Sequence, residues 1–125
     1  MSALVIFSVD VRRLASFYER VLEASATAES SGDIRLTTGS DEVLIHSIPK
    51  EVAAGISIST PPAPRDNSAL KPVFEVAALT RALLAVEENG GVVTSRTFRL
   101  GGITRHDILD PDGNVIQLRS SSATE

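Results

Sequence analysis

The first part of the chain has the hydrophobic pattern of a strand followed by a helix. Residues 4–9 form a largely apolar run, and Asp10 directly after it is a suitable N-cap. The next apolar residues recur at helical spacing and predict an amphipathic helix over residues 11–22: Val11, Leu14, Ala15, Phe17, Tyr18, Val21 and Leu22. Three short strands separated by glycine-containing turns are then predicted, at 26–29, 33–37 and 42–48.

The same order of patterns recurs in the second half. A shift of 68 residues aligns Val5 with Val73 and Tyr18 with Val86. The repeat predicts a strand over 72–76 and a helix that starts near Leu79 and stops at the glycines 90 and 91. Three further strands are predicted, at 92–95, 103–109 and 114–119.

Two βαβββ modules in tandem follow from this repeat, which makes the fold class α+β. A four-stranded sheet with one helix cannot cover both of its faces, so we expect two such modules to pair and curve around a shared cavity. We place the first module at about 1–58 and the second at about 68–125 of a single domain. The connector, 59–67, contains three prolines. A ferredoxin-like sandwich is the alternative fold, but it lacks the third strand after each helix.

The most informative stretch runs from Asp110 to Arg119. Asp110-Pro111-Asp112-Gly113-Asn114 is dense in turn residues, because Pro presets φ while Gly and Asn accept positive φ. The following residues alternate between two sets, as expected of a strand with one face on the core and one wetter face: Val115, Gln117 and Arg119, against Ile116 and Leu118. A hairpin of this kind would direct Gln117 into a cavity.

This hairpin resembles the C-terminal hairpin of the vicinal oxygen chelate superfamily, which includes glyoxalase I, extradiol dioxygenases and bleomycin-resistance proteins. The Phe17-Tyr18 pair followed by Val21-Leu22-Glu23 is similar to the first-helix signature of the superfamily. The run 101–107 before the turn is similar to the corresponding segment of many small bacterial members of the superfamily. The resemblance covers nearly the whole chain and implies a glyoxalase-like fold. It implies no single activity, because this scaffold carries isomerases, lyases, dioxygenases, transferases and simple binding proteins.

The resemblance also implies four metal-ligand positions, which can be tested residue by residue. They fall on Ala3, on its repeat mate Lys71, on Ile45, and on Gln117, where the superfamily usually has Glu. A methyl group cannot coordinate, an ammonium has no lone pair, and an amide oxygen is a weak ligand. His46 lies one residue from the second position and would reach the cavity only after a one-residue slip. We therefore expect no metal and no cofactor at the usual site.

The remaining polar residues offer candidates for binding a ligand. His106 and Asp107 are adjacent in a predicted strand, so only one of them can face the cavity. Lys71 and Glu75 share one strand face. Three arginines flank the glycines 101 and 102 and could hold a carboxylate or phosphate: Arg96, Arg99 and Arg105.

Composition excludes several classes of protein. The 125 residues suit one domain, and a formal net charge of −4 without a Lys/Arg cluster argues against nucleic-acid binding. The absence of cysteine excludes a disulfide framework, a thiol nucleophile and a thiolate metal site. The apolar start is short and lacks a basic segment, and no run approaches the length of a membrane span. We expect a cytoplasmic protein.

Three functions remain open, and the sequence leaves undecided whether the protein is an enzyme. The favoured one is a metal-independent binder of small molecules. The second is a lyase, isomerase or dioxygenase with a displaced metal site that uses His46 and His106. The third is a non-catalytic interaction module. For the first, we expect a homodimer and a site with Lys71, Gln117 and His46 on its floor. The Arg99–Arg105 loop would form its rim, and the ligand would be anionic or carbonyl-bearing.

Overall fold

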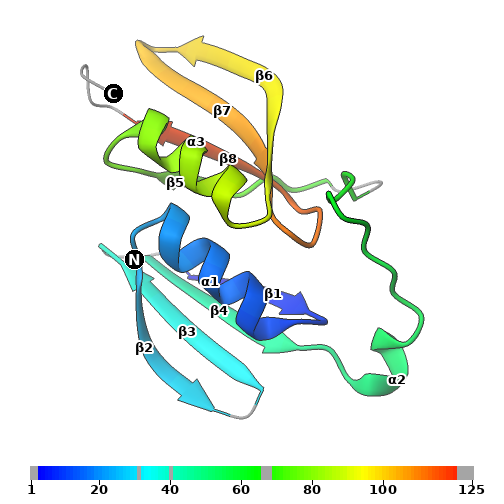
Figure 1. Cartoon of the computed structure of the whole chain (residues 1–125). Helices are drawn as coiled ribbons and strands as arrows, with labels where there is room; N and C mark the ends of the chain where they lie inside the picture. Colours follow the sequence, from blue (N-terminus) through cyan, green and yellow to red (C-terminus); the bar gives the residue numbers. More distant parts are fainter. Residues whose placement is uncertain (1–2, 31, 40, 66–68, 121–125) are drawn as a thin grey trace.

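The computed structural model describes residues 3–30, 32–39, 41–65 and 69–120 (Figure 1). The last two residues of the predicted connector lie outside these ranges. The first sheet has the strand order β1 (Ala3–Ser8), β4 (Asp41–Ser47), β3 (Asp33–Thr38) and β2 (Ser25–Ser30). The second sheet has the order β5 (Val73–Glu75), β8 (Val115–Ser120), β7 (Ile103–Leu109) and β6 (Val92–Leu100). The helices are α1 (Val11–Val21), the short α2 (Lys50–Ala53) and α3 (Leu79–Glu88).

The two sheets have the same topology. In each, the strand before the long helix pairs in parallel with the last strand of its module, and the other pairings are antiparallel. Both modules are therefore βαβββ units, and the α+β prediction is confirmed. Each long helix is followed by three strands, which excludes the ferredoxin-like alternative.

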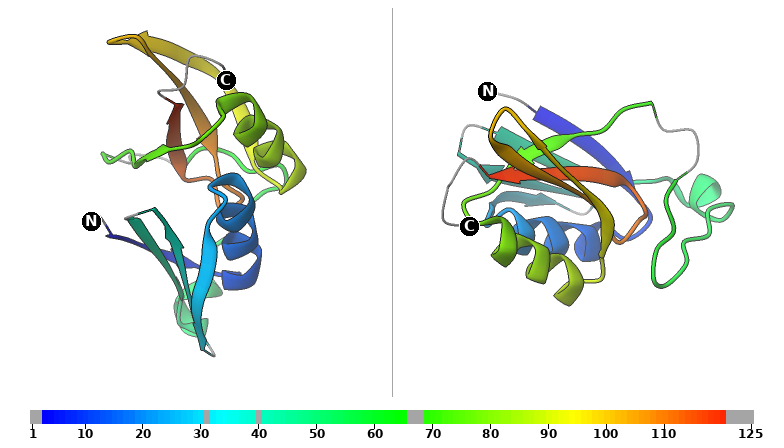
Figure 2. Two further views of the ribbon diagram at one scale, coloured as in Figure 1. Left: turned by 90° about the vertical axis from the view of Figure 1, so that its left-hand side faces the viewer. Right: turned by 90° about the horizontal axis from the view of Figure 1, so that it is seen from above.

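Helices α1 and α3 lie side by side and cover one face of the sheets (Figures 1 and 2). The helix α1 starts where the Asp10 side chain accepts a hydrogen bond from the Arg13 amide, and it buries one apolar face. The left view of Figure 2 shows the two sheets diverging on the side away from the helices. We call this side of each sheet its open face. No helix in the described part of the chain is long and apolar enough to cross a membrane.

Buried polar contacts tie β1 and α1 to the 110–114 turn of the other module. The hydroxyl of Tyr18 donates to Asp110 at 2.7 Å, and the hydroxyl of Ser8 donates to Asp112 at 2.7 Å. Burial raises the pKa of the Asp110 carboxyl, and the hydrogen bonds from Tyr18 and Asn114 oppose that rise. These carboxylates are buried but fully engaged, so the turn is fixed against the first module.

Strand β6 is longer than the sequence predicts. Its expected range ended at residue 95, whereas the strand continues to Leu100. Residues 95–100 are all exposed, so their sequence carries no buried face that would identify a strand. A register shift between Val93 and Thr97 forms a bulge, beyond which β6 and β7 pair up to the turn at glycines 101 and 102.

Candidate functional site

The register of the second sheet places Gln117 and Asp107 side by side. Ile116 and Leu118 are fully buried under the helices, so Gln117 between them projects to the open face. Its partner across the strand pair β7–β8 is Asp107, and residues directly opposite each other share a face. Both polar side chains are nevertheless largely covered, with 1% of Asp107 and 8% of Gln117 exposed.

These two residues are the centre of a charged group that we call the Asp107 cluster: Lys71, Arg96, Arg105, Asp107 and Gln117. Lys71 Nζ donates to Asp107 Oδ2 at 2.8 Å, and Gln117 Nε2 donates to Asp107 Oδ1 at 3.2 Å. Arg105 Nη1 donates to Gln117 Oε1 at 3.1 Å. Lys71 and Gln117 thus converge on one carboxylate.

The bulge in β6 brings the third cation to this cluster. The Thr94 hydroxyl donates to the Asp107 carbonyl and accepts from the Arg96 amide, which fixes the extra residues of the bulge. The Arg96 guanidinium then lies 3.8 Å from Asp107 Oδ2. Phe98 follows on the same face, and Lys71 Nζ lies 5.7 Å from the centre of its ring.

The cluster carries an excess of positive charge. Lys71 and Arg96 lie beside the Asp107 carboxylate, and Arg105 is bound to the neighbouring Gln117. A carboxylate buried this deeply requires such charged partners. The cations exceed what Asp107 needs for neutrality. The Nε of Arg105 is buried and has no hydrogen-bond partner among the described residues. The cluster is therefore suited to accept an additional anion.

Two hollows lie where the sheets meet, along β1. We call the first, of about 250 Å³, the seam hollow; its lining includes Val5, Phe7, Arg65, Leu70, Pro72 and Val115. The second, of about 400 Å³, includes Ala3, Glu42, Glu75 and Arg119. Glu75 and Arg119 form an ion pair at 3.1 Å there. Glu75 lies on the open face, where Lys71 also reaches Asp107, but it borders the second hollow and not the Asp107 cluster.

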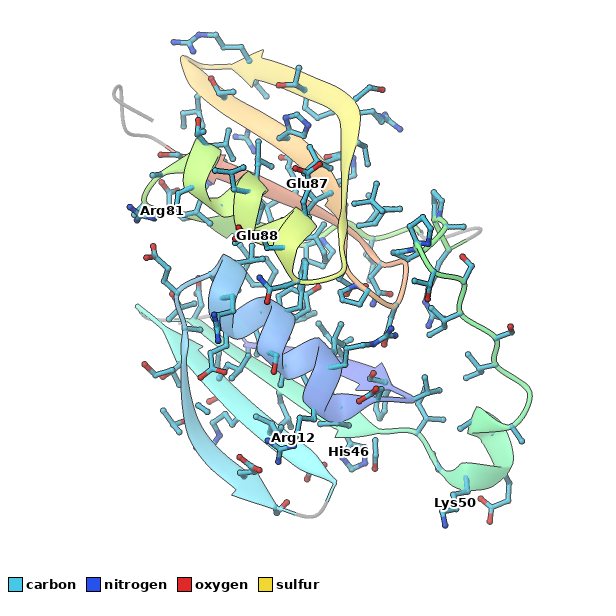
Figure 3. The ribbon with its side chains drawn as sticks, in the orientation of Figure 1. Arg12, His46, Lys50, Arg81, Glu87 and Glu88 are labelled. Carbon is cyan, nitrogen blue, oxygen red and sulfur yellow. The ribbon has the colours of Figure 1, made fainter. Side chains whose placement is uncertain are left out.

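His46 lies on the open face of the first sheet. Its strand partners are Phe7 and Asp33, and its Nδ1 contacts the Asp33 carboxylate. The Phe7 ring meets the imidazole edge-on, with 5.5 Å between ring centres. Figure 3 shows His46 near the end of β4 that leads to α2. The neighbouring Ile45 is fully buried in the core, so it cannot be a cavity residue.

The register also corrects the position expected for the second metal ligand. Val73 pairs with Gln117, and its repeat mate Val5 pairs with Leu44. The counterpart of Gln117 is therefore Leu44, one residue before the predicted Ile45. Alanine, leucine and lysine supply no ligand atom, and both polar ends of the Gln117 amide are already bonded. Within the ranges that the structure describes, no three His, Cys, Asp or Glu side chains are grouped to hold a metal. These positions do not fit a divalent ion.

Two other predicted residues lie on the opposite face. The partner of His106 on β8 is the core residue Leu118, and its Nε2 lies 2.7 Å from the Thr94 carbonyl oxygen. Arg99 pairs with Thr104, on the helix side of the hairpin, and donates to its hydroxyl. Arg99 and Arg105 therefore do not form one rim. Asp107, not His106, faces the site. The apolar Ile108 next to it could have indicated this, because it is buried in the core and neighbouring strand residues point to opposite faces.

The sequence pattern of the glyoxalase/bleomycin resistance protein/dioxygenase superfamily matches residues 1–118. The chain belongs to this superfamily. Among curated proteins, none has a sequence that matches the chain significantly.

Several solved structures share the fold. An enzyme of this family from Burkholderia phytofirmans PsJN superposes with a TM-score of 0.72 at 15% identity, over 96% of this chain and 97% of that one. The bleomycin resistance determinant encoded on transposon Tn5 gives 0.64 at 20% identity, over 98% of both chains. An integron cassette protein from the mobile metagenome of V. cholerae gives 0.64 at 24% identity, over 98% and 94%.

Proposed function

We propose that this superfamily member is a small-molecule-binding protein that works without a divalent metal at the usual ligand positions. The observation that carries the proposal is the bonding of Gln117. Its amide oxygen accepts from Arg105 and its amide nitrogen donates to Asp107. A metal would have to displace Arg105 and enter beside Lys71 and Arg96, whose charges repel it.

The first test is elemental analysis of protein purified without chelator or affinity tag. We expect far less than one zinc, nickel, iron or manganese per chain. Near-stoichiometric metal that is lost in Gln117→Ala would refute the proposal. A thermal-shift screen of small molecules completes the test, because ligands of a metal-independent site raise the unfolding midpoint equally with and without chelator.

The alternative functions have less support. His46 and His106 lie on different sheets and on opposite faces, so they cannot share one displaced metal. In a pure interaction module, side chains would fill the cavity. The two hollows along β1 argue against this alternative.

We further propose that the protein is a homodimer. Large apolar side chains are exposed on the open faces, with 56% of Phe7, 49% of Val5 and 66% of Leu100 accessible. A second copy that covers these side chains would remove apolar area from water and would also cover an unpaired strand edge.

A further inference from the structure

Lys71 belongs to the Asp107 cluster, and the residues on either side of it in the chain belong to the lining of the seam hollow. Its neighbours in the chain, Leu70 and Pro72, both line the hollow, while its ammonium reaches Asp107. Val115 lines the hollow too and lies two residues before Gln117 on the same face of β8. Two residues of a strand rise by about 7 Å, so the charged and the apolar parts lie about this distance apart along β8.

The charged part is suited to a carboxylate. A guanidinium binds a carboxylate through two parallel N–H groups on one edge. Arg105 uses Nη1 for Gln117, and its buried Nε has no acceptor within the described ranges. Lys71 has further N–H donors besides the one given to Asp107. An incoming carboxylate would thus find an unused guanidinium edge beside a second cation.

The apolar part limits the size of the rest of the ligand. Val5, Phe7, Leu70 and Val115 are apolar residues in the lining, and Arg65 is a polar one. The volume of about 250 Å³ lies below the ~300–1,000 Å³ typical of pockets for drug-sized ligands. One ring or a short aliphatic chain matches this volume better than a large antibiotic does.

We propose that the ligand is an amphipathic monocarboxylate: Lys71 and Arg105 bind its carboxylate, and its apolar body occupies the seam hollow. This inference rests on the proposed function and narrows it to one chemical class. The site selects ligands by charge at the Lys71–Arg105 end and by size in the seam hollow.

The test uses 4-phenylbutyrate, whose arm between ring and carboxylate suits the spacing along β8. Its neutral amide has nearly the same shape. Calorimetric titration of the whole protein should show saturable binding of the acid at millimolar concentration. The amide should bind at least tenfold more weakly, because it lacks the charge-assisted hydrogen bonds.

Variants then assign the two ends of the site. Lys71→Met and Arg105→Gln should each weaken binding of the acid by about ten- to a hundredfold, and Lys71→Arg should retain most of it. Arg99→Gln is the matched control, since it removes the same charge from the same hairpin on the opposite face. Val115→Phe, which fills the hollow, should weaken the acid and the amide alike. Circular dichroism and the thermal midpoint verify that each variant is folded.

Other outcomes would overturn the inference. Equal binding of acid and amide would show that charge is not recognised, and an Arg99→Gln loss as large as that of Arg105→Gln would place the anion elsewhere. If the acid does not bind but the thermal-shift screen yields neutral ligands without metal, this inference fails while the proposed function stands. Stoichiometric metal at Gln117 would instead refute the proposed function itself.

Discussion

An amide in place of a carboxylate changes the chemistry of the open face. Gln117 accepts from one neighbour and donates to another, whereas a glutamate could only accept and would repel Asp107. The sequence repeat was sufficient to predict that Lys71 and Gln117 lie close together. The repeat did not reveal Asp107 as their partner. The register between β7 and β8 decides which of His106 and Asp107 faces the cavity, and the local sequence pattern does not fix that register.

Tyr18 gives the stability of the protein a dependence on pH. Burial raises the pKa of Tyr18 well above 10.0, and the nearby Asp110 raises it further. Above about pH 10 the unfolded chain loses this proton while the folded chain keeps it, so the free energy of unfolding falls as pH rises. Tyr18→Phe removes the titrating group and the hydrogen bond to Asp110. We expect it to cost about 1–3 kcal/mol at neutral pH and to flatten the alkaline decline.

Urea unfolding at neutral pH and above pH 10 measures both effects. Tyr18 is the single tyrosine, so its own absorbance reports the titration. Lys50→Gln, which removes an exposed amine, is the control for lysine titration. A Tyr18→Phe variant that loses stability above pH 10 as steeply as the parent would contradict this explanation.

Most elements could be predicted from their own sequence, and the exceptions have a common cause. Helix α1 and strand β7 have a buried face, and their observed ranges agree with the predicted ones to within a residue. The outer half of β6 and the short helix α2 bury no side chain, so no hydrophobic period marks them. Their form is decided by pairing with β7 and by the path of the connector.

The 110–114 turn is sensitive to substitution at Gly113. Gly113 has a φ of +87°, and a Cβ added there would lie 2.3 Å from the Ala63 carbonyl oxygen. Gly102 also has a positive φ, +79°, but a Cβ there meets nothing within 4 Å. Backbone strain alone should lower the free energy of unfolding of Gly102→Ala by about 1–2 kcal/mol. Gly113→Ala should lose clearly more, because the connector must also move.

Chemical unfolding of these two variants side by side separates strain from crowding. Equal losses would mean that the connector yields freely at Ala63, and that the turn is not held by its neighbours.

At the scale of the whole molecule, the sheets leave apolar side chains and two hollows along their junction. If a second copy covers the exposed apolar side chains, light scattering should give a mass near twice 13.2 kDa at micromolar concentration. A dilution series should show the mass falling towards that of one chain. A mass of 13.2 kDa throughout would contradict the dimer and leave each site to a single chain.

The hydrogen bonds from Ser8 of β1 and Tyr18 of α1 to the 110–114 turn also set an order of events during synthesis. Ser8 and Asp112 are 104 positions apart, and Tyr18 and Asp110 are 92 apart. The hydroxyls of Ser8 and Tyr18 therefore meet their partners only after the 110–114 turn has been synthesised. Contacts of such long range slow folding, and they couple the two modules into one cooperative unit. The first βαβββ unit is thus made before the second but is completed only together with it.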